Sequence, residues 1–540
     1  ANSTGTTNVA VGSSALLANT TGTDNVAVGA LALDANTTAS QNTAVGRNAL
    51  TANTTGHSGI AIGAYALNAN TTGAYNLAIG RDTMVSNTTG TRNSAVGSNS
   101  LDANTTGSHN IAFGYAALTA NTTASYNIAI GDSAMGANTT GTQNIAIGQD
   151  ALATMSTSSY NTGVGYQALK VNTGQENAAF GTDSLLANTS GGRNTGLGAY
   201  SLNANTTAND NTGVGYLTLY ATTTGVDNTA VGAKALKTAT TATRNTAVGM
   251  DSLQACTTGS YNTGIGQRAL YASTTGTENV AMGYLAMDAN TTGSYNVGLG
   301  VNALGANTTA NYNTAVGIGA MIANTTGHSN VAIGATAGDG ITTGVENTIV
   351  GYLAGDNITT ESYNIMLGHG TTAGNRNNHC IVIGHDISID GNFFAFGKSG
   401  NYVYNGFTSN ASWTRSSDER LKKNISTSTL GLDFINALRP VTFNWKDSRE
   451  IDSSDSELTD HYNADENLMD STTTLHGFVA QEVKTAMDNA GVSNFGGWNK
   501  LSTGVEGVSL EAMVTPLVKA LQEADDKIDA LTTRVAALES

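Results

Sequence analysis

The sequence contains little proline, cysteine, charge or aromatic content, and each shortage excludes a class of protein. Its 540 residues include two prolines and two cysteines, with 6% aromatic and 12% charged residues. A typical globular domain is about 25% charged, so ordinary domains do not fill this chain. Cys256 and Cys380 are too few for a disulfide framework, and both are expected as small buried thiols.

The acidic balance of the chain bears on its partners. The formal net charge is −17. Phosphate binding needs clustered Lys and Arg, so we expect no nucleic-acid partner and no anionic membrane surface. No run of 18 apolar residues occurs, which predicts no membrane insertion.

A short phrase, "NTAVG" at residues 42–46, fills most of the chain by repetition. It occurs 23 times from Asn8 to Cys380, with 20 of 22 spacings equal to 17 residues and two equal to 16. Every start is followed four residues later by Gly, and the residue before that Gly is always apolar. A disordered linker has no reason to keep such a register, although its low charge would be compatible with disorder.

Each repeat predicts two short strands and two turns. "NTAVG" alternates in period two, "ALxA" is a second apolar stretch, and "NTTG" is turn chemistry. The Gly of the first stretch suits a positive φ or a close backbone approach. Seventeen residues are too few for a helical hairpin and fit one coil of a parallel β-solenoid. Stacking in register would place Asn above Asn and Thr above Thr, and 23 coils would span roughly 110 Å.

The repeat pattern resembles the head repeats of trimeric autotransporter adhesins, "NxAxG" followed by "A". The resemblance covers residues 1 to about 391. It implies a mainly β, left-handed β-roll-like solenoid that forms a homotrimeric rod. Those adhesin repeats are shorter than 17 residues, so side-by-side chains and chains wound about one axis both stay open.

Three features of the repeats have a structural and a functional interpretation. The "NTT" triplets match N-glycosylation acceptors, but a turn Asn and a ladder Thr explain them without a glycan. Aligned Thr side chains could bind ice, which we keep as a minor alternative. His369, His379 and His385 could bind a metal on a threefold axis. Their spacing is not diagnostic, so we expect surface positions, no metal and no cofactor.

The composition changes after Gly384. Six Phe and Tyr residues and Trp413 predict a β-rich neck over residues 392–416, between the 1–391 shaft and a 417–540 globular domain. That last domain begins with "SSDERLKKNI" at 416–425 and is expected to be α+β.

This junction resembles the C-terminal intramolecular chaperone of endosialidase tail spikes and other phage fibres, an autoprocessing serine peptidase family. The motif S-D-x-R-x-K places Ser417, Asp418, Arg420 and Lys422, and further matches occur at 432–446, 476–483 and 509–523. The resemblance implies that Ser417 is the nucleophile, that Lys422 is its base, and that the Ser416–Ser417 bond is cut. Asp418 and Arg420 would position the strand or a partner chain without transferring protons, and His476 and Gln481 would support the motif. A plain Ser/Asp helix cap is the structural alternative.

The last segment predicts a trimerising coiled-coil helix over residues 513–540. Its apolar residues are spaced alternately four and three apart, as in a heptad seam: Leu517, Leu521, Ala524, Ile528, Leu531, Val535 and Leu538. A single amphipathic helix packed on its own domain is the alternative.

Together these segments predict a trimeric phage tail fibre or spike on the virion, assembled by a chaperone that releases itself. A receptor on the host cell surface is the expected partner, and autoproteolysis in cis is the only enzymatic activity expected. A bacterial surface adhesin is the alternative, distinguished by an export signal or anchor N-terminal to residue 1. A glycan-degrading spike is a minor alternative, because the repeats offer no paired carboxylates.

Overall fold

A computed structural model describes residues 3–374, 378–390, 393–406, 414–415, 417–458, 461–462, 464, 471–501 and 504–540. The chain divides into two compact units, Ala1–Ser416 and Ser417–Ser540. The first unit is mainly β and the second combines short strands with helices.

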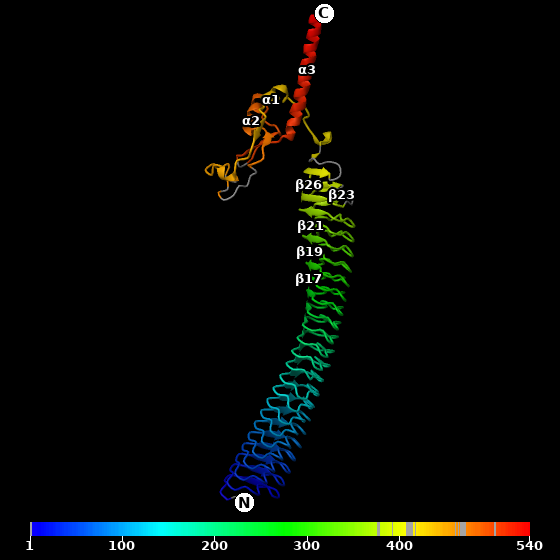
Figure 1. The fold of residues 1–540 in the computed structure, drawn as a ribbon. Coiled ribbons are helices and arrows are strands. Elements are labelled where there is room, and N and C mark those ends of the chain that lie inside the picture. The colour runs from blue at the N-terminus through cyan, green and yellow to red at the C-terminus, as the bar shows by residue number, and fades with distance from the viewer. Residues whose placement is uncertain are drawn as a thin grey trace. The chain divides into compact units, whose positions relative to one another are not determined.

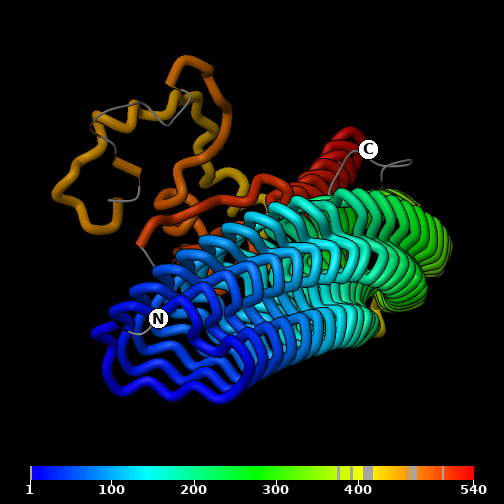
Figure 2. The backbone as a smooth tube through the Cα atoms, turned by 90° about the horizontal axis from the view of Figure 1, so that it is seen from below, coloured from blue at the N-terminus to red at the C-terminus, as the bar shows by residue number. Residues whose placement is uncertain are grey.

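Each coil of the first unit contributes one three-residue strand to a continuous parallel sheet. These strands are β1 (Val9–Val11), β2 (Val26–Val28), β3 (Thr43–Val45), β4 (Ile60–Ile62), β5 (Leu77–Ile79), β6 (Ser94–Val96), β7 (Ile111–Phe113), β8 (Ile128–Ile130), β9 (Ile145–Ile147), β10 (Thr162–Val164), β11 (Ala178–Phe180), β12 (Thr195–Leu197), β13 (Thr212–Val214), β14 (Thr229–Val231), β15 (Thr246–Val248), β16 (Thr263–Ile265), β17 (Val280–Met282), β18 (Val297–Leu299), β19 (Thr314–Val316), β20 (Val331–Ile333), β21 (Thr348–Val350) and β22 (Ile365–Leu367). Residue pairs such as Ile111 and Ile128 lie in register one repeat apart. The coils therefore stack one on the next, with the strands in a column (Figures 1 and 2). The predicted parallel β-solenoid with 17-residue coils is confirmed.

One feature of the coil differs from the sequence prediction, because the "ALxA" stretch forms no strand. Coil positions are numbered from 1 at the start of each repeat. Leu118, at position 9, has a φ of 53°, and Ala116, at position 7, has the same φ. Alternating left-handed residues fold this stretch into a compact turn, which a β-strand geometry excludes. Leu118 nevertheless lies fully buried in the coil interior.

The invariant Gly at position 5 is required by both conformation and space. Gly131 has a φ of 133°, where a side chain is strained. A Cβ there would lie 2.6 Å from the carbonyl carbon and oxygen of Gly148 in the next coil. The column of glycines therefore sets how closely neighbouring coils approach.

The strand residues divide between the coil interior and the outside. In β7, Ala112 is fully buried, whereas Phe113 keeps 39% of its surface exposed. The same pattern recurs along the shaft, since position 3 faces inward and positions 2 and 4 face outward. We call the side chains at positions 2 and 4 the outer strand face. Because position 4 is apolar in every repeat, the outer strand face is an apolar ribbon along the shaft.

Two columns of buried Asn side chains run through the interior, at positions 1 and 12. In the second column, Asn121 Nδ2 donates to Asn104 Oδ1 at 2.9 Å, and Asn121 Oδ1 accepts from Asn138 Nδ2 at 3.1 Å. In the first, Asn110 Oδ1 accepts the backbone N–H of Asn127 at 3.0 Å. The predicted Asn ladders are thus confirmed, and burial of position 12 withdraws the Asn of each "NTT" triplet from glycosylation in the folded shaft.

In coils that hold Asn at both positions, the two Asn columns also converge on one backbone carbonyl. Gly141 O, at position 15, accepts from Asn127 Nδ2 at 2.9 Å and from Asn138 Nδ2 at 3.0 Å. A buried carbonyl has two lone pairs, and here both receive a donor. This pairing explains why Asn, with a donor and an acceptor on one short side chain, occupies both columns.

The position-12 column is interrupted where the sequence departs from Asn. Because each Asn donates towards the preceding coil, the last Asn of a run keeps an acceptor without a donor. The Oδ1 atoms of Asn138, Asn205 and Asn324 are buried and lack a hydrogen bond among the described residues. Position 12 of the following coil holds, respectively, Met155, Thr222 and Ile341. Each interruption therefore leaves one orphaned buried amide oxygen.

Both cysteines occupy buried Asn positions, as predicted for small buried thiols. Cys256 stands at position 12, and its Sγ donates to Gly259 O at 3.3 Å, in the manner of the Asn it replaces. Burial raises the pKa of the Cys256 thiol to about 12. Cys380 takes position 1 of its coil and is also fully buried. Neither forms a disulfide.

The shaft changes at its C-terminal end, where strands of two to six residues replace the regular coil. The strands are β23 (Thr372–Gly374), β24 (Ile381–His385), β25 (Ser388–Asp390), β26 (Phe393–Lys398), β27 (Asn401–Gly406) and β28 (Thr414–Arg415). β24 and β26 continue the parallel sheet, whereas β27 and β28 join it antiparallel. Trp413 and Ser416 lie outside the described residues.

The C-terminal unit is small and has a correspondingly small core. It contains α1 (Leu432–Ala437), β29 (Val441–Phe443), β30 (Leu475–Gly477), α2 (Ala480–Asn489), β31 (Trp498–Lys500), β32 (Glu506–Val508) and α3 (Val514–Glu539), with single 3-10 turns at Glu419–Leu421, Ser448–Glu450 and Glu511–Met513. Its core consists of Leu430, Phe434, Val483, Ala486, Met487 and Met513. Leu432 N–H donates to Glu523 Oε2 at 2.7 Å, which joins the start of α1 to α3.

Helix α3 leaves its apolar seam uncovered. Its six large seam residues are each between 48% and 85% exposed: Leu517, Leu521, Ile528, Leu531, Val535 and Leu538. Among the described residues, no helix has the length and apolar content needed to cross a membrane.

Candidate functional site

The two residues predicted as a catalytic dyad lie in direct contact. Ser417 begins the C-terminal unit, and a single turn over Glu419–Leu421 folds the chain back so that Lys422 faces it. Lys422 Nζ and Ser417 Oγ are 2.6 Å apart. Nucleophile and base must be within hydrogen-bond reach, and this separation meets that requirement.

Asp418 and Arg420 hold the turn between the two dyad residues. Asp418 caps the turn by accepting the Arg420 backbone N–H at 2.9 Å, and its carboxylate also accepts from Arg420 Nε at 3.0 Å. The Arg420 guanidinium and backbone amide lower the pKa of the Asp418 carboxyl. With the carboxylate bound to Arg420, this pair holds the turn that brings Lys422 to Ser417.

The dyad is open to solvent in the single chain, since Ser417 and Lys422 are both exposed. A lysine acts as a base only when it is neutral, and a desolvated environment is what favours that form. The described chain alone thus supplies the contact between the two groups but not the desolvation. Ser416, the residue on the other side of the predicted scissile bond, lies outside the described residues.

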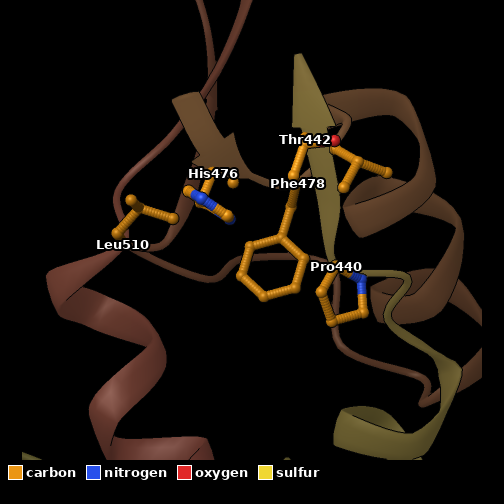
Figure 3. A pocket seen from close by; sticks show the side chains of 7 residues that line it. Pro440, Thr442, His476, Phe478 and Leu510 are labelled. Carbon is orange, nitrogen blue, oxygen red and sulfur yellow. The ribbon is translucent and has the colours of Figure 1, made fainter. Parts of the chain in front are cut away.

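His476 and Gln481 lie on a separate apolar groove of the C-terminal unit. Pro440, Thr442, His476, Phe478 and Leu510 surround a cavity of about 510 Å³ (Figure 3). Gln481 lines the adjoining cavity of about 500 Å³ with His476. Within the described part of the chain, no hydrogen bond or ion pair connects either residue to Ser417 or Lys422. Their predicted support of the motif stays a prediction.

Comparison with known proteins addresses the same segment. Residues 417–492 match the family model described as the chaperone of endosialidase. The match therefore lies within the C-terminal unit. No curated protein matches the chain. The match begins at Ser417, and this domain together with the long solenoid fits the shaft of a tail fibre or spike.

The three histidines near the end of the shaft separate into two groups. His369 and His385 lie beside each other with Asp386, whereas His379 stacks on Tyr363 with ring centroids 4.9 Å apart. From the sequence alone, each of these histidines was a possible single ligand on a threefold axis. The repeat register could have grouped His369 with His385. The two residues are 16 apart and their coils also begin 16 residues apart, so both take the same position in successive coils.

Proposed function

We propose that this chain is a segment of a homotrimeric fibre in which the solenoid is the shaft and the C-terminal unit is a self-releasing intramolecular chaperone. The observation that carries this proposal is the 2.6 Å contact between Ser417 and Lys422 at the first residue of the chaperone match. A nucleophile at a domain boundary lies next to the bond it would cut in its own chain, which fits a single release event.

Two uncovered apolar surfaces support three copies as the assembled state. One is the α3 seam, whose spacing of four and three residues fits helices packed in a coiled coil. The other is the outer strand face, where residues such as Phe113 and Leu197 stay exposed in the single chain. We propose that copies of this chain cover both the α3 seam and the outer strand face, because the two surfaces belong to one polypeptide and would be covered together.

The chaperone also addresses the register of the shaft. Near-identical coils could pair one repeat out of step between chains at little cost per contact. Helices α3 of three chains joined in one register would place all three shafts at the same coil. Pairing could then propagate away from that end, and the finished trimer would resist unzipping through its many coils.

The cleavage chemistry follows from the dyad. Lys422 accepts the Ser417 hydroxyl proton while Ser417 Oγ attacks the carbonyl carbon of Ser416. The peptide C–N bond breaks as Oγ forms an ester with that carbon, and the Ser417 nitrogen takes up the proton. Water then hydrolyses the ester, which leaves a carboxylate at Ser416 and restores the Ser417 hydroxyl. Because Lys422 is exposed in one chain, we place cleavage after assembly, when partner chains would exclude water from it.

Intact mass under denaturing conditions tests this chemistry. The wild-type chain should give two species, 1–416 and 417–540, whereas Ser417→Ala and Lys422→Met should give one full-length species. Lys423→Met removes the neighbouring lysine and should cleave like the wild type. A full-length wild type, or cleavage that persists in Ser417→Ala, would contradict the proposed nucleophile. Loss of cleavage in Lys423→Met as well would mean that a general effect of lysine removal had been measured.

We place the assembled fibre on a phage virion, where a rigid shaft holds a receptor-binding end away from the particle and towards the host cell. The support is the chaperone of endosialidase domain joined to a repetitive shaft. Binding of the fluorescently labelled released shaft to bacterial cells tests the receptor, with the heat-unfolded shaft as control. Labelling no stronger than the control on a panel of hosts would contradict a receptor on this segment.

A further inference from the structure

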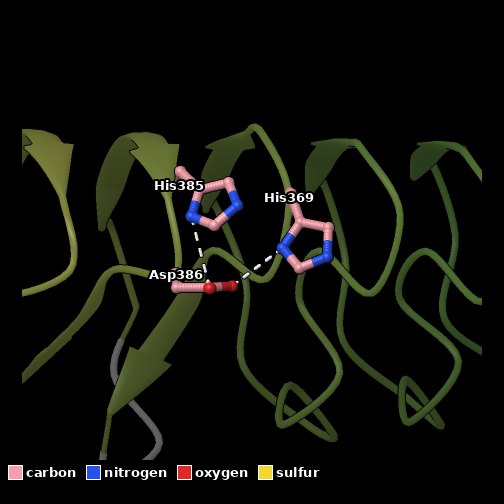
Figure 4. A group of neighbouring side chains, drawn as sticks. All are labelled: His369, His385 and Asp386. Carbon is pink, nitrogen blue, oxygen red and sulfur yellow. Dashed lines mark hydrogen bonds and ion pairs between the residues drawn. The ribbon is translucent and has the colours of Figure 1, made fainter.

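The last regular coils of the shaft carry a side-chain cluster that the proposed function does not use. His369 follows β22, and His385 ends β24 in the next coil. Each occupies position 6, directly after the coil Gly, so the stacking places one imidazole above the other. Their rings are stacked with centroids 4.7 Å apart (Figure 4).

Asp386 completes the cluster from position 7 of the second coil. His369 Nδ1 lies 2.8 Å from Asp386 Oδ1, and His385 Nδ1 lies 3.2 Å from Asp386 Oδ2. Figure 4 shows both Nδ1 atoms turned towards the one carboxylate. One ligand atom from each residue thus lies within 4.8 Å of the other two, although the residues come from two coils.

This arrangement is local to the end of the shaft. The preceding coil has Tyr352 at position 6, whose ring contacts His369 but offers no imidazole. His379 lies between the two cluster histidines in sequence, yet it stacks on Tyr363 and is not part of the cluster. Among the described residues, this is the one group of three metal-ligating side chains brought together.

We propose that His369, His385 and Asp386 bind a divalent transition metal, with Zn²⁺ as the representative ion. Two imidazole nitrogens and one carboxylate oxygen are ligands that Zn²⁺ takes in three-residue sites. All three residues are exposed, so water can fill the remaining coordination position. A bound ion would fasten one coil to the next at the point where the regular solenoid ends. It would act as a structural clamp, since the groove and the dyad lie in the other unit.

Lys398 offers a second test of the proposed metal site. It pairs in register with His385 on the neighbouring strand β26. A lysine ammonium near the site opposes a cation, so removing this charge should strengthen metal binding while leaving all three ligands in place.

Isothermal titration of the metal-free full-length protein with ZnCl₂ tests the site. We expect one Zn²⁺ per chain in the wild type and at least about tenfold weaker binding in His385→Ala and in His369→Ala. His379→Ala is the matched control and should bind like the wild type, and Lys398→Ala should bind more tightly. Zn²⁺ should also raise the thermal midpoint of the wild type and of His379→Ala, but not that of His385→Ala. No Zn²⁺ binding by the wild type, or equal loss in His379→Ala and His385→Ala, would overturn the proposal.

Discussion

The two units of this chain differ in how they bury their polar and apolar side chains. In the shaft, each coil covers the next, and interior Asn side chains pair with their copies one repeat away. In the C-terminal unit, six buried residues form the core, while the large seam residues of α3 stay exposed. The shaft thus pairs most of its buried Asn side chains along one chain and leaves its outer strand face exposed, whereas the C-terminal unit leaves the apolar seam of its longest helix exposed.

The difference indicates where the assembly information lies. A repeating surface specifies that copies can meet but not in which register, because every coil offers nearly the same contacts. A single helix with a unique end can specify register once. We infer that the non-repeating unit directs the pairing of the repeating one.

The largest effect should come from charge placed in the α3 seam. Leu521→Asp combined with Ile528→Asp puts two carboxylates per chain into the proposed helix interface, where like charges oppose association. We expect complete loss of the assembled species by size-exclusion chromatography and loss of a trypsin-resistant shaft. Thr533→Asp adds a charge to α3 outside the seam and should assemble normally. An assembled double mutant would show that the shaft finds its partners without α3.

A smaller but still severe effect should come from the coil glycine. Gly131→Ala forces a side chain into a φ of 133° and against the Gly148 carbonyl, so we expect a loss of about 3–5 kcal/mol in the free energy of unfolding. Gly136→Ala in the same coil is the matched control, because its nearest neighbour is 3.3 Å away. Urea denaturation should separate the two variants. Equal midpoints would contradict the close approach of neighbouring coils.

Two substitutions in the position-12 Asn column should lower the stability by different amounts. Asn121→Ala removes three hydrogen bonds inside a run. It leaves Asn104 Oδ1 buried without a donor in addition to Asn138 Oδ1, so the free energy of unfolding should fall by about 2–4 kcal/mol. Asn138→Ala, at the end of the run, removes two and should cost about 1 kcal/mol less. Thermal midpoints of both variants give the comparison. A larger loss for Asn138→Ala would contradict the direction of the ladder.

The smallest effect should depend on pH. Burial alone would raise the pKa of Glu361, but the amides of Thr359 and Thr360 outweigh it and leave that pKa below its ordinary value. A lowered carboxyl pKa contributes stability at neutral pH that is lost as the pH falls through the folded-state value. The gap in unfolding free energy between wild type and Glu361→Gln should be about 1–2 kcal/mol at neutral pH, and it should close as the pH falls below the ordinary carboxyl pKa and through the lowered value of the folded protein.

Glu346→Gln changes an exposed carboxylate one coil earlier and serves as the control. The measurement is the urea midpoint of the three proteins at several pH values. A gap for Glu361→Gln that stays constant down to pH 3 would show that the amide hydrogen bonds do not depend on the carboxylate charge.

Much of the shaft could be predicted because the 17-residue repeat is visible in its sequence. The position of Asn104 above Asn121 follows from a 17-residue spacing, and the invariant Gly predicts its own close approach. The second strand was wrongly predicted because an apolar stretch does not reveal its φ angles. Leu118 takes a left-handed conformation that its residue type disfavours, and the packing of neighbouring coils overrides that local preference.

The candidate site divides in the same way. The motif around Ser417 predicted which residues meet, and a 2.6 Å contact agrees with it. Sequence could not show that Lys422 is exposed, because exposure depends on which chains surround it. The cluster of His369 and His385 was not predicted, because each histidine was considered as a single ligand. The repeat register already places both at position 6 of successive coils.

The central claim is that the C-terminal unit brings three copies of this chain together, and the molar mass of Ser417→Ala tests it most directly. This variant keeps the chain whole, so light scattering after size-exclusion chromatography reports assembly without the complication of cleavage. The account predicts a mass of three times the 54.9 kDa chain. A single species at 54.9 kDa, with the α3 seam and outer strand face left uncovered in solution, would contradict it.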